Sequence, residues 1–211
     1  MKKENILCFV AHPDDSIIGI GSTLAKYVKE KKRIIEVIFS YGEISHLKKE
    51  IIVKKRVSEI KSAAKILGYK DIIFFGLPDS KIKQNVEKVK DDIKKLIRKY
   101  RPIKIFTHSP SDKLPDHLAV NEAVISCINE MKFDTYIYGF DVWNITNLKE
   151  SENPKLYVDV SDTFELKIKA LKEFKSQRHV ILQLMPSIYT RAKLHGDHLD
   201  CKYAERFYKL N

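Results

Sequence analysis

The 211-residue sequence predicts an α/β fold of three layers, in which helices cover both faces of a mainly parallel sheet. The main observation is an alternation, up to about residue 140, of short apolar runs rich in β-branched residues with longer segments of helical periodicity. A second is the absence of any internal repeat or of a linker rich in Pro, Gly or Ser. We therefore expect one domain over residues 1–211, with residues 145–211 as a C-terminal extension that packs on it.

The first strand is expected over residues 5–10, which form a continuous apolar run. A glycine-punctuated segment follows and leads into a helix over about 22–31, where Leu24, Ala25 and Val28 share one face.

Strongly β-branched residues over 33–40 predict the second strand. A long helix is expected over 49–67, and Gly68 ends it in the usual C-terminal position. The third strand is expected over 71–75 and, after a loop, the next helix over 85–100.

The fourth strand is expected over 102–107, a helix over 117–131 and the fifth strand over 134–140. Beyond residue 140 the pattern weakens. The elements expected there are a loop over 142–154, a short strand over 156–160, a helix that ends near residue 176 and, around a turn at Pro186, one or two further helical stretches.

A formal net charge of +11 raises the question of an anionic partner, since 39 Lys and Arg residues outnumber 28 Asp and Glu residues. The lysines are spread over most of the predicted helices, and no compact basic stripe with interleaved aromatic residues is present. This distribution is typical of solvated helix faces, with a mild preference for anionic substrates. It does not support nucleic-acid binding.

No apolar run is long enough to span a bilayer, and the N-terminus lacks the hydrophobic region and cleavage site of a signal peptide. The expected location is therefore the cytoplasm. Cys8, Cys127 and Cys201 show no paired spacing, which predicts neither a disulfide framework nor a thiolate zinc site. No Gly-x-Ser-x-Gly elbow and no full dinucleotide fingerprint are present, which argues against a serine hydrolase and a dinucleotide-binding enzyme.

Histidine and aspartate gather in the loops that follow the predicted strands. They are His12, Asp14 and Asp15 after the first strand, Asp79 after the third, and His108, Asp112, Asp116 and His117 after the fourth. Because the carboxyl ends of parallel strands meet at one edge of the sheet, we expect most of these side chains to lie close together. Imidazole nitrogen and carboxylate oxygen form a ligand set that suits zinc. The alternative is an Asp N-cap beside a surface histidine.

Two imidazoles and one carboxylate, from His12, Asp15 and His117, would leave a fourth zinc position for a water molecule. Asp14 could then take the proton of that water as general base. Asp116, with Asp112 in the same loop, is expected to orient a ligand through a hydrogen bond. His and Asp ligands also accept other divalent transition metals such as iron and manganese.

The sequence resembles the LmbE-like (PIG-L) zinc-dependent N-deacetylases, and the resemblance covers nearly the whole chain. The motifs that carry it are Ala11-His12-Pro13-Asp14-Asp15, Arg56 with Glu59 before Leu67-Gly68, Gly76-Leu77-Pro78-Asp79, Pro115-Asp116-His117 within 107–120, Ser176-Gln177, and Tyr203-Ala204-Glu205-Arg206-Phe207. The resemblance implies a Rossmann-like, LmbE-like fold. It also implies hydrolysis of an N-acetyl group from an N-acetylglucosamine-type amino sugar derivative, with metal-bound water as the nucleophile.

Position by position, His12, Asp15 and His117 match the zinc ligands of this family, and Asp14 matches its general base. Arg56 falls where some members have a substrate-binding arginine. For Arg56 the alternative is a helix-surface ion pair with Glu59 at three-residue spacing.

Two positions depart from the family pattern. Ser16 replaces a glutamate that is not a ligand, so we expect a local change at most. Leu114 replaces a histidine that helps to stabilise the oxyanion and to protonate the leaving amine, and losing one such donor typically costs about a hundredfold or more in rate.

Three explanations of Leu114 stay open: Asp14 serves as base and acid in turn, another histidine reaches the site, or the chain is a catalytically weak or inactive ligand-binding relative. The histidines that could reach in are His108, a candidate substrate-binding residue, and the C-terminal His195 and His198, which are expected to lie in a loop. The alternative for His108 is a strand-end residue bonded to the backbone.

The partner expected for the chain is a small N-acetylated sugar, with no nucleic acid and no membrane span. Trp143, beside Asn144, could line a sugar site, although a single aromatic residue there more often serves packing. The sequence does not define whether the chain forms a homo-oligomer.

Overall fold

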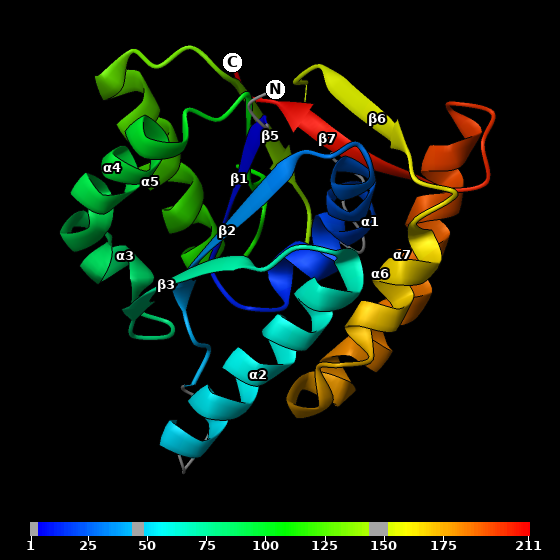
Figure 1. Cartoon of the computed structure of the whole chain (residues 1–211), viewed down its shortest axis with the longest axis horizontal. Helices are drawn as coiled ribbons and strands as arrows, with labels where there is room; N and C mark the ends of the chain where they lie inside the picture. Colours follow the sequence, from blue (N-terminus) through cyan, green and yellow to red (C-terminus); the bar gives the residue numbers. More distant parts are fainter. Residues whose placement is uncertain (1–3, 44–48, 144–151) are drawn as a thin grey trace.

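The computed structural model describes residues 4–43, 49–143 and 152–211, in which seven strands form one sheet (Figure 1). In their order across the sheet the strands are β3 (Asp71–Leu77), β2 (Arg33–Ser40), β1 (Asn5–Val10), β4 (Lys104–His108), β5 (Tyr136–Phe140), β7 (Ala204–Lys209) and β6 (Lys155–Asp159). The strands from β1 to β5 pair in parallel, whereas β7 is antiparallel to both β5 and β6. The predicted α/β class with a mainly parallel sheet is confirmed.

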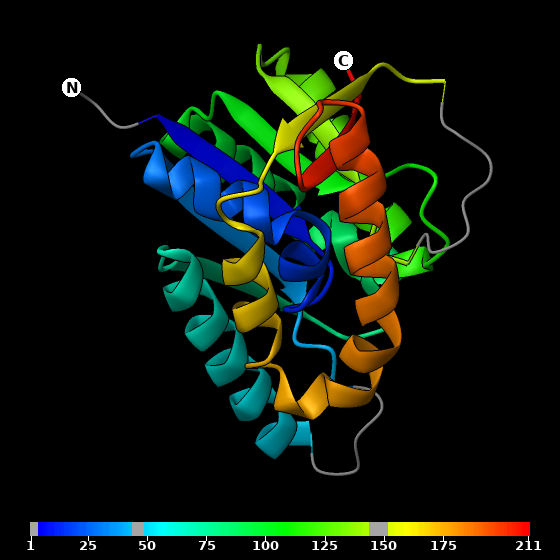
Figure 2. The same cartoon turned by 90° about the vertical axis from the view of Figure 1, so that its right-hand side faces the viewer.

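Helices cover both faces of this sheet and give the three layers (Figures 1 and 2). One face carries α1 (Asp15–Lys29), α2 (Lys49–Leu67), α6 (Phe164–Leu171) and α7 (Arg178–Asp197). The other carries α3 (Ile82–Asn85), α4 (Lys90–Tyr100) and α5 (Pro115–Met131), with a short 3-10 turn at Val86–Val89. A second 3-10 turn, at Lys175–Gln177, joins α6 to α7. In the described ranges, no helix is long and apolar enough to cross a bilayer.

Strand β1 lies inside the sheet, between β2 and β4. Because successive side chains of a strand point to opposite faces, Ile6, Cys8 and Val10 join the core under α1. Leu7 and Phe9 join the core under α4 and α5. From β1 the chain adds β2 and β3 on one side and β4 and β5 on the other, so a switch in strand order lies at the carboxyl end of β1.

Helix α1 begins at Asp15, whereas the sequence led us to expect its start near residue 22. Its two glycines do not break the helix but let neighbouring groups approach it closely. A Cβ atom on Gly19 would collide with the Phe140 ring, and one on Gly21 would lie 3.3 Å from Cγ of Lys167. Close packing therefore overrides the weak helical preference of glycine.

Two expectations for the C-terminal region were wrong. Pro186 lies inside the continuous helix α7 rather than at a turn, and packing of Ile181, Leu184 and Ile188 in the core holds the helix around it. The chain then ends in strand β7, where only helical stretches were expected, and β7 fills the position between β5 and β6. This pairing places the end of the chain in the same sheet as β1, while the single-domain organisation stays a prediction.

A carboxylate is buried in the middle of the apolar strand β2. Glu36 is fully buried, and it accepts a 2.8 Å hydrogen bond from the hydroxyl of Tyr69 and another from the hydroxyl of Ser16. Burial raises the pKa of Glu36 to about 7, although these two hydrogen bonds oppose the shift. Ser16, the residue that departs from the family pattern, thus connects α1 to a carboxylate of the neighbouring strand.

Replacing Glu36 with Gln is expected to make the free energy of unfolding less dependent on pH. Because folding raises the pKa of Glu36 from 4.5 to about 7, the contribution of this side chain to stability is fully present below pH 4.5 and is lost as the pH rises through about 7. The Gln variant should therefore match the wild type near pH 4.5 and exceed it by up to about 3 kcal/mol at pH 8. Urea unfolding at both pH values measures this. Glu122→Gln, on the exposed face of α5, is the matched control, and equal pH dependence of all three proteins would contradict the assignment.

Candidate active site

The loops after β1 and β4 bring their polar side chains together at the carboxyl edge of the sheet. His12, Asp15 and His117 each offer a ligand atom, and these atoms lie within 4.8 Å of one another. His12 and Asp15 flank the start of α1, and His117 lies in the first turn of α5. The strand-order switch therefore gathers the three residues that the sequence proposed as metal ligands, and their role as ligands stays a prediction.

The carboxylate of Asp15 is the centre of this group. Its Oδ2 accepts a 2.7 Å hydrogen bond from the backbone N–H of His12, which fixes the turn between β1 and α1. The same oxygen lies 3.3 Å from Nε2 of His117 and 3.4 Å from Nε2 of His108. One carboxylate oxygen at the end of β1 thus faces two imidazoles from the end of the neighbouring strand β4.

Three further carboxylates surround the imidazoles. Nε2 of His12 lies 3.1 Å from Oδ1 of Asp79 and 3.7 Å from Oδ2 of Asp116. Nδ1 of His117 lies 3.0 Å from Oδ2 of Asp112. The predicted orienting groups Asp112 and Asp116 therefore lie beside the two histidines predicted to bind the metal, as expected for carboxylates that fix a ring orientation.

Asp79 was expected at this edge of the sheet, because it follows the third strand, but it was given no role. In the structure its Oδ1 lies 3.1 Å from Nε2 of His12. Within the part of the chain that the structure describes, two more overlapping groups could hold a metal ion. They are His108, Asp112 and His117, and His12, Asp79 and Asp116.

The electrostatics of the cluster favour a bound cation. Burial on its own would lower the pKa of His12, but contacts with three carboxylates raise it well above its ordinary value. Burial also opposes ionisation of His117, yet the charges of Asp15 and Asp112 raise its pKa to about 9. A cluster that draws protons onto its imidazoles carries a surplus of negative charge, which a divalent cation would neutralise.

His117 supplies a second observation that fits a metal. The side chain is fully buried, and its Nε2 has no hydrogen-bond partner among the described residues. A buried polar atom without a partner is costly, and a metal ion at this nitrogen would remove that cost. The residues present therefore fit a divalent transition metal.

Asp14 is held by an arginine from α2. Nη2 of Arg56 donates to Oδ1 of Asp14 at 2.8 Å, and Nη1 donates to the carbonyl oxygen of Gly42 at 2.7 Å. Both side chains of the ion pair are buried. Glu59, the alternative partner of Arg56, instead accepts a 2.8 Å hydrogen bond from the backbone N–H of Ser176. The geometry thus connects Arg56 to the candidate base, and its contact with substrate stays a prediction.

His108 is fully buried and stacks on His117, with ring centroids 3.8 Å apart. Its Nε2 accepts a 3.0 Å hydrogen bond from the backbone N–H of Ala11. Burial and the charge of His117 lower the pKa of His108 to about 4, which keeps the ring neutral. The structure favours the backbone-bonded alternative for this residue, and its predicted substrate contact stays untested.

Leu114 is the N-cap residue of α5, and its backbone N–H donates to Oδ1 of Asp112 at 3.0 Å. His195 and His198 do not lie in a loop as expected, because His195 belongs to α7 and His198 directly follows its last residue. Both rings contact Tyr157 instead, with centroid distances of 5.8 Å and 4.6 Å. Of these three candidate histidines, His108 is the one that lies beside the Asp15 carboxylate, with its Nε2 3.4 Å from Oδ2.

Trp143 packs, partly buried, against the core under α1, which agrees with the packing alternative. The neighbouring Asn144 lies outside the described residues, as does most of the loop expected over 142–154.

Comparisons with known proteins show similarity to deacetylases in sequence and in fold. The diacetylchitobiose deacetylase of Thermococcus kodakarensis is 27% identical over 96% of this chain and 81% of its own length. Among solved structures, the N,N'-diacetylchitobiose deacetylase of Pyrococcus horikoshii superposes with a TM-score of 0.83 at 23% identity, covering 98% of this chain and 84% of that chain.

The same fold also carries other chemistry. A 4-carboxy-2-hydroxymuconate hydratase from Pseudomonas putida superposes with a TM-score of 0.84 at 16% identity, covering 99% of this chain and 96% of that chain. Fold similarity at this identity therefore does not define the reaction. The family profile described as GlcNAc-PI de-N-acetylase, PIG-L, matches residues 7–128, which is more than half of the sequence and includes His12, Asp14, Asp15 and His117. The predicted resemblance is confirmed, and the chain belongs to the PIG-L family of deacetylases.

Proposed function

We propose that the chain is a metal-dependent hydrolase that removes an N-acetyl group from an N-acetylglucosamine-type amino sugar derivative. The observation that carries the proposal is the convergence of His12, Asp15 and His117 beside the buried carboxylate of Asp14. Membership of a deacetylase family supports the reaction class, and the diacetylated sugar in the names of the relatives supports the substrate class.

His12, Asp15 and His117 would hold the metal, for which we propose zinc, with other divalent transition metals as alternatives. Such a metal would supply Lewis-acid polarisation of the acetamide carbonyl and a lowered pKa of water. Asp112, 3.0 Å from Nδ1 of His117, would hold that ring in its orientation. The cytoplasmic location remains an expectation from the sequence.

Asp14 would accept a proton from the attacking water as the new carbon–oxygen bond forms. As the carbon–nitrogen bond breaks, the amine nitrogen takes up the proton that Asp14 carries, and the acetic acid that leaves loses its remaining proton to solvent as acetate. Arg56, 2.8 Å from Asp14, keeps the carboxylate in place and compensates its charge in a buried setting. This assigns base and acid to one residue, which is the simplest way for a site with Leu114 to complete the cycle.

The proposal is tested by metal analysis of the purified full chain together with an acetate-release screen over N-acetylated sugars. We expect about one transition metal per chain and turnover of at least one N-acetylglucosamine derivative. Activity should be lost on chelation and should return when metal is added. A chain that binds no transition metal at micromolar concentration would refute the metal-dependent assignment.

A second candidate is a catalytically weak, ligand-binding relative, and the leucine at position 114 favours it. Leu114 is half-buried and ends the loop that positions Asp112. A leucine can neither donate a proton nor neutralise a developing oxyanion.

Leu114→His is expected to raise the rate of acetate release by about a hundredfold if the chain is a weak relative. An unchanged rate, with substantial turnover by the wild type, would show that Asp14 manages both proton transfers. The measurement is kcat at saturating sugar, with metal content determined for both proteins. Leu118→His, one turn further along α5, is the matched control for adding a histidine near this helix end.

A further inference from the structure

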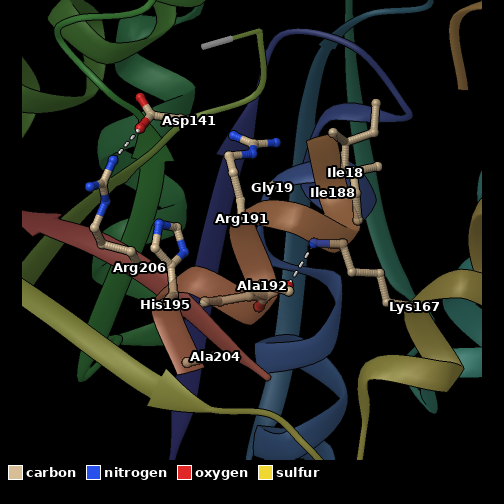
Figure 3. A pocket seen from close by; sticks show the side chains of 11 residues that line it. Ile18, Gly19, Asp141, Lys167, Ile188, Arg191, Ala192, His195, Ala204 and Arg206 are labelled. Atoms are coloured by element: carbon tan, nitrogen blue, oxygen red, sulfur yellow. Dashed lines mark hydrogen bonds and ion pairs between the residues drawn. The ribbon is translucent and has the colours of Figure 1, made fainter. Parts of the chain in front are cut away.

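A small pocket lies between α1, α7 and β7, on the sheet face that also carries α6 (Figure 3). Its volume of about 30 Å³ exceeds the roughly 10–15 Å³ that one water molecule needs, but it is too small for a sugar ring. Three cationic side chains line it: Lys167 from α6, Arg191 from α7 and Arg206 from β7. The pocket therefore fits a small group, and its lining is basic.

Two of these cations have carboxylate partners. Nζ of Lys167 lies 2.7 Å from Oε1 of Glu205, and Nη2 of Arg206 lies 3.6 Å from Oδ2 of Asp141 (Figure 3). Glu205 also accepts a 2.8 Å hydrogen bond from the backbone N–H of Thr23, so it connects β7 to α1. These contacts account for both carboxylates of the pocket.

The guanidinium of Arg191 stands between the two ion pairs (Figure 3). Its Nε is buried without a hydrogen-bond partner, and no carboxylate in the described ranges lies within ion-pair distance of it. Burial lowers the pKa of Arg191, Asp141 opposes this shift and the charge of Arg206 adds to it. Arg191 as a whole is half-buried, and a cation whose buried Nε lacks a partner favours a counter-ion.

The remaining titratable side chain of the pocket is His195, whose pKa falls to about 3 because of burial and of the positive charges of Arg206 and Arg191. It is therefore neutral near pH 7. Among the described residues that line the pocket, three cations and two carboxylates leave one net positive charge. This charge matches one singly charged anion.

The pocket lies one side chain away from the candidate metal site. The Phe140 ring packs against Gly19, which lines the pocket, and lies 5.2 Å from the ring of His108. Asp141 directly follows Phe140 at the carboxyl end of β5. The pocket and the metal site therefore share one edge of the sheet.

We propose that this pocket is a carboxylate-binding site, with Arg191 as the principal partner of the bound anion. A carboxylate has the size and charge that the pocket requires, and a guanidinium binds it through two parallel hydrogen bonds. Two sources share this chemistry: free acetate, which the proposed hydrolysis releases, and a carboxylate carried by the sugar substrate.

Thermal unfolding of the metal-loaded full chain in increasing sodium acetate tests the site. The wild type should melt roughly 3–5 °C higher for each tenfold excess of acetate over its dissociation constant. Arg191→Met should lose this response, and without acetate it should melt at or above the wild type because it lacks the uncompensated charge. Lys193→Met, on the exposed face of the same helix, removes equal charge and should respond like the wild type.

An equal acetate response in wild type and Arg191→Met would overturn the proposal, as would a wild type that does not respond. If Arg191→Met does not fold, Arg191→Lys replaces it. Lysine keeps the charge but lacks the fork, so the midpoint of the acetate response should move to roughly tenfold higher concentration. An unchanged midpoint in that variant would equally overturn the site.

Kinetics separate the two sources, and this arm alone rests on the proposed function. For a carboxylate on the substrate, Arg191→Met should raise KM roughly tenfold for an acidic N-acetylated sugar and leave KM for a matched neutral sugar unchanged. For free acetate, both KM values stay unchanged and inhibition by acetate weakens roughly tenfold. Absence of turnover with every sugar would count against the deacetylase, and the melting experiment would still decide the carboxylate site.

Discussion

Replacing Asp14 with Asn is expected to lower the rate of acetate release by about 10²–10⁴-fold while the metal content stays near that of the wild type. An amide at this position keeps the shape of the side chain but cannot take a proton. Asp14 belongs to none of the residue groups that could hold a metal in the described part of the chain, so removing its charge should not release the metal. Paired assays of kcat and of metal per chain check both halves of this expectation.

The ion pair with Arg56 defines the control for this variant. Without the Asp14 charge, the buried guanidinium of Arg56 loses its 2.8 Å partner, which costs stability as well as activity. The control is therefore a thermal unfolding curve, which establishes whether Asp14→Asn is folded at the assay temperature. Asp91→Asn, an exposed carboxylate in the first turn of α4, should leave both activity and metal content unchanged. Full activity of Asp14→Asn would remove Asp14 from the role of base.

The core of the fold follows from local pattern. Strands β1 to β5 are short apolar runs, and the segments between consecutive strands are long enough for a crossover that contains a helix. The C-terminal strand β7 could not be predicted in the same way. Its position between β5 and β6 depends on partners that lie far away in the sequence, such as Tyr138 opposite Lys209. Local periodicity does not predict strand pairing between residues that lie so far apart in the sequence.

The candidate site also has one part that the sequence predicts and another that depends on long-range packing. The grouping of His12, Asp15 and His117 could be predicted because the carboxyl ends of parallel strands lie at one edge of the sheet, so the loops that follow them are neighbours. The contact between Asp14 and Arg56 could not, since it depends on how α2 packs beside the loop after β2. Spacing on α2 favoured Glu59 as the partner of Arg56, and tertiary packing directs Glu59 to Ser176.

The proposed carboxylate pocket could not be predicted from the sequence. Its three cations come from α6, α7 and β7, and within a chain of net charge +11 none of them is distinctive. Arg191 differs from the many solvated cations because it is half-buried and its buried Nε has no hydrogen-bond partner among the described residues, which only a structure reveals. Charge excess is therefore informative at buried positions and uninformative on helix surfaces.

Replacing His117 with Ala is expected to abolish metal retention, with metal content falling from about one per chain to near zero and acetate release falling with it. The residue is fully buried, and Nε2 lies 3.3 Å from Oδ2 of Asp15 at the centre of the cluster. Alanine removes one of three proposed ligands and takes the His117 imidazole away from the carboxylates of Asp15 and Asp112. Elemental analysis after gel filtration in metal-free buffer provides the measurement.

Two variants make the His117 result specific. His179→Ala removes an exposed imidazole at the start of α7 and should keep the metal. Asp112→Asn leaves all three proposed ligands in place and weakens only the group that orients His117, so metal affinity should fall by about 10–100-fold rather than vanish. This graded order follows from the contacts, because His117 faces Asp15 with one nitrogen and Asp112 with the other. Stoichiometric metal in folded His117→Ala would contradict the assignment of His117 as a ligand. It would instead favour the group of His12, Asp79 and Asp116, which lies in the same cluster and does not include His117.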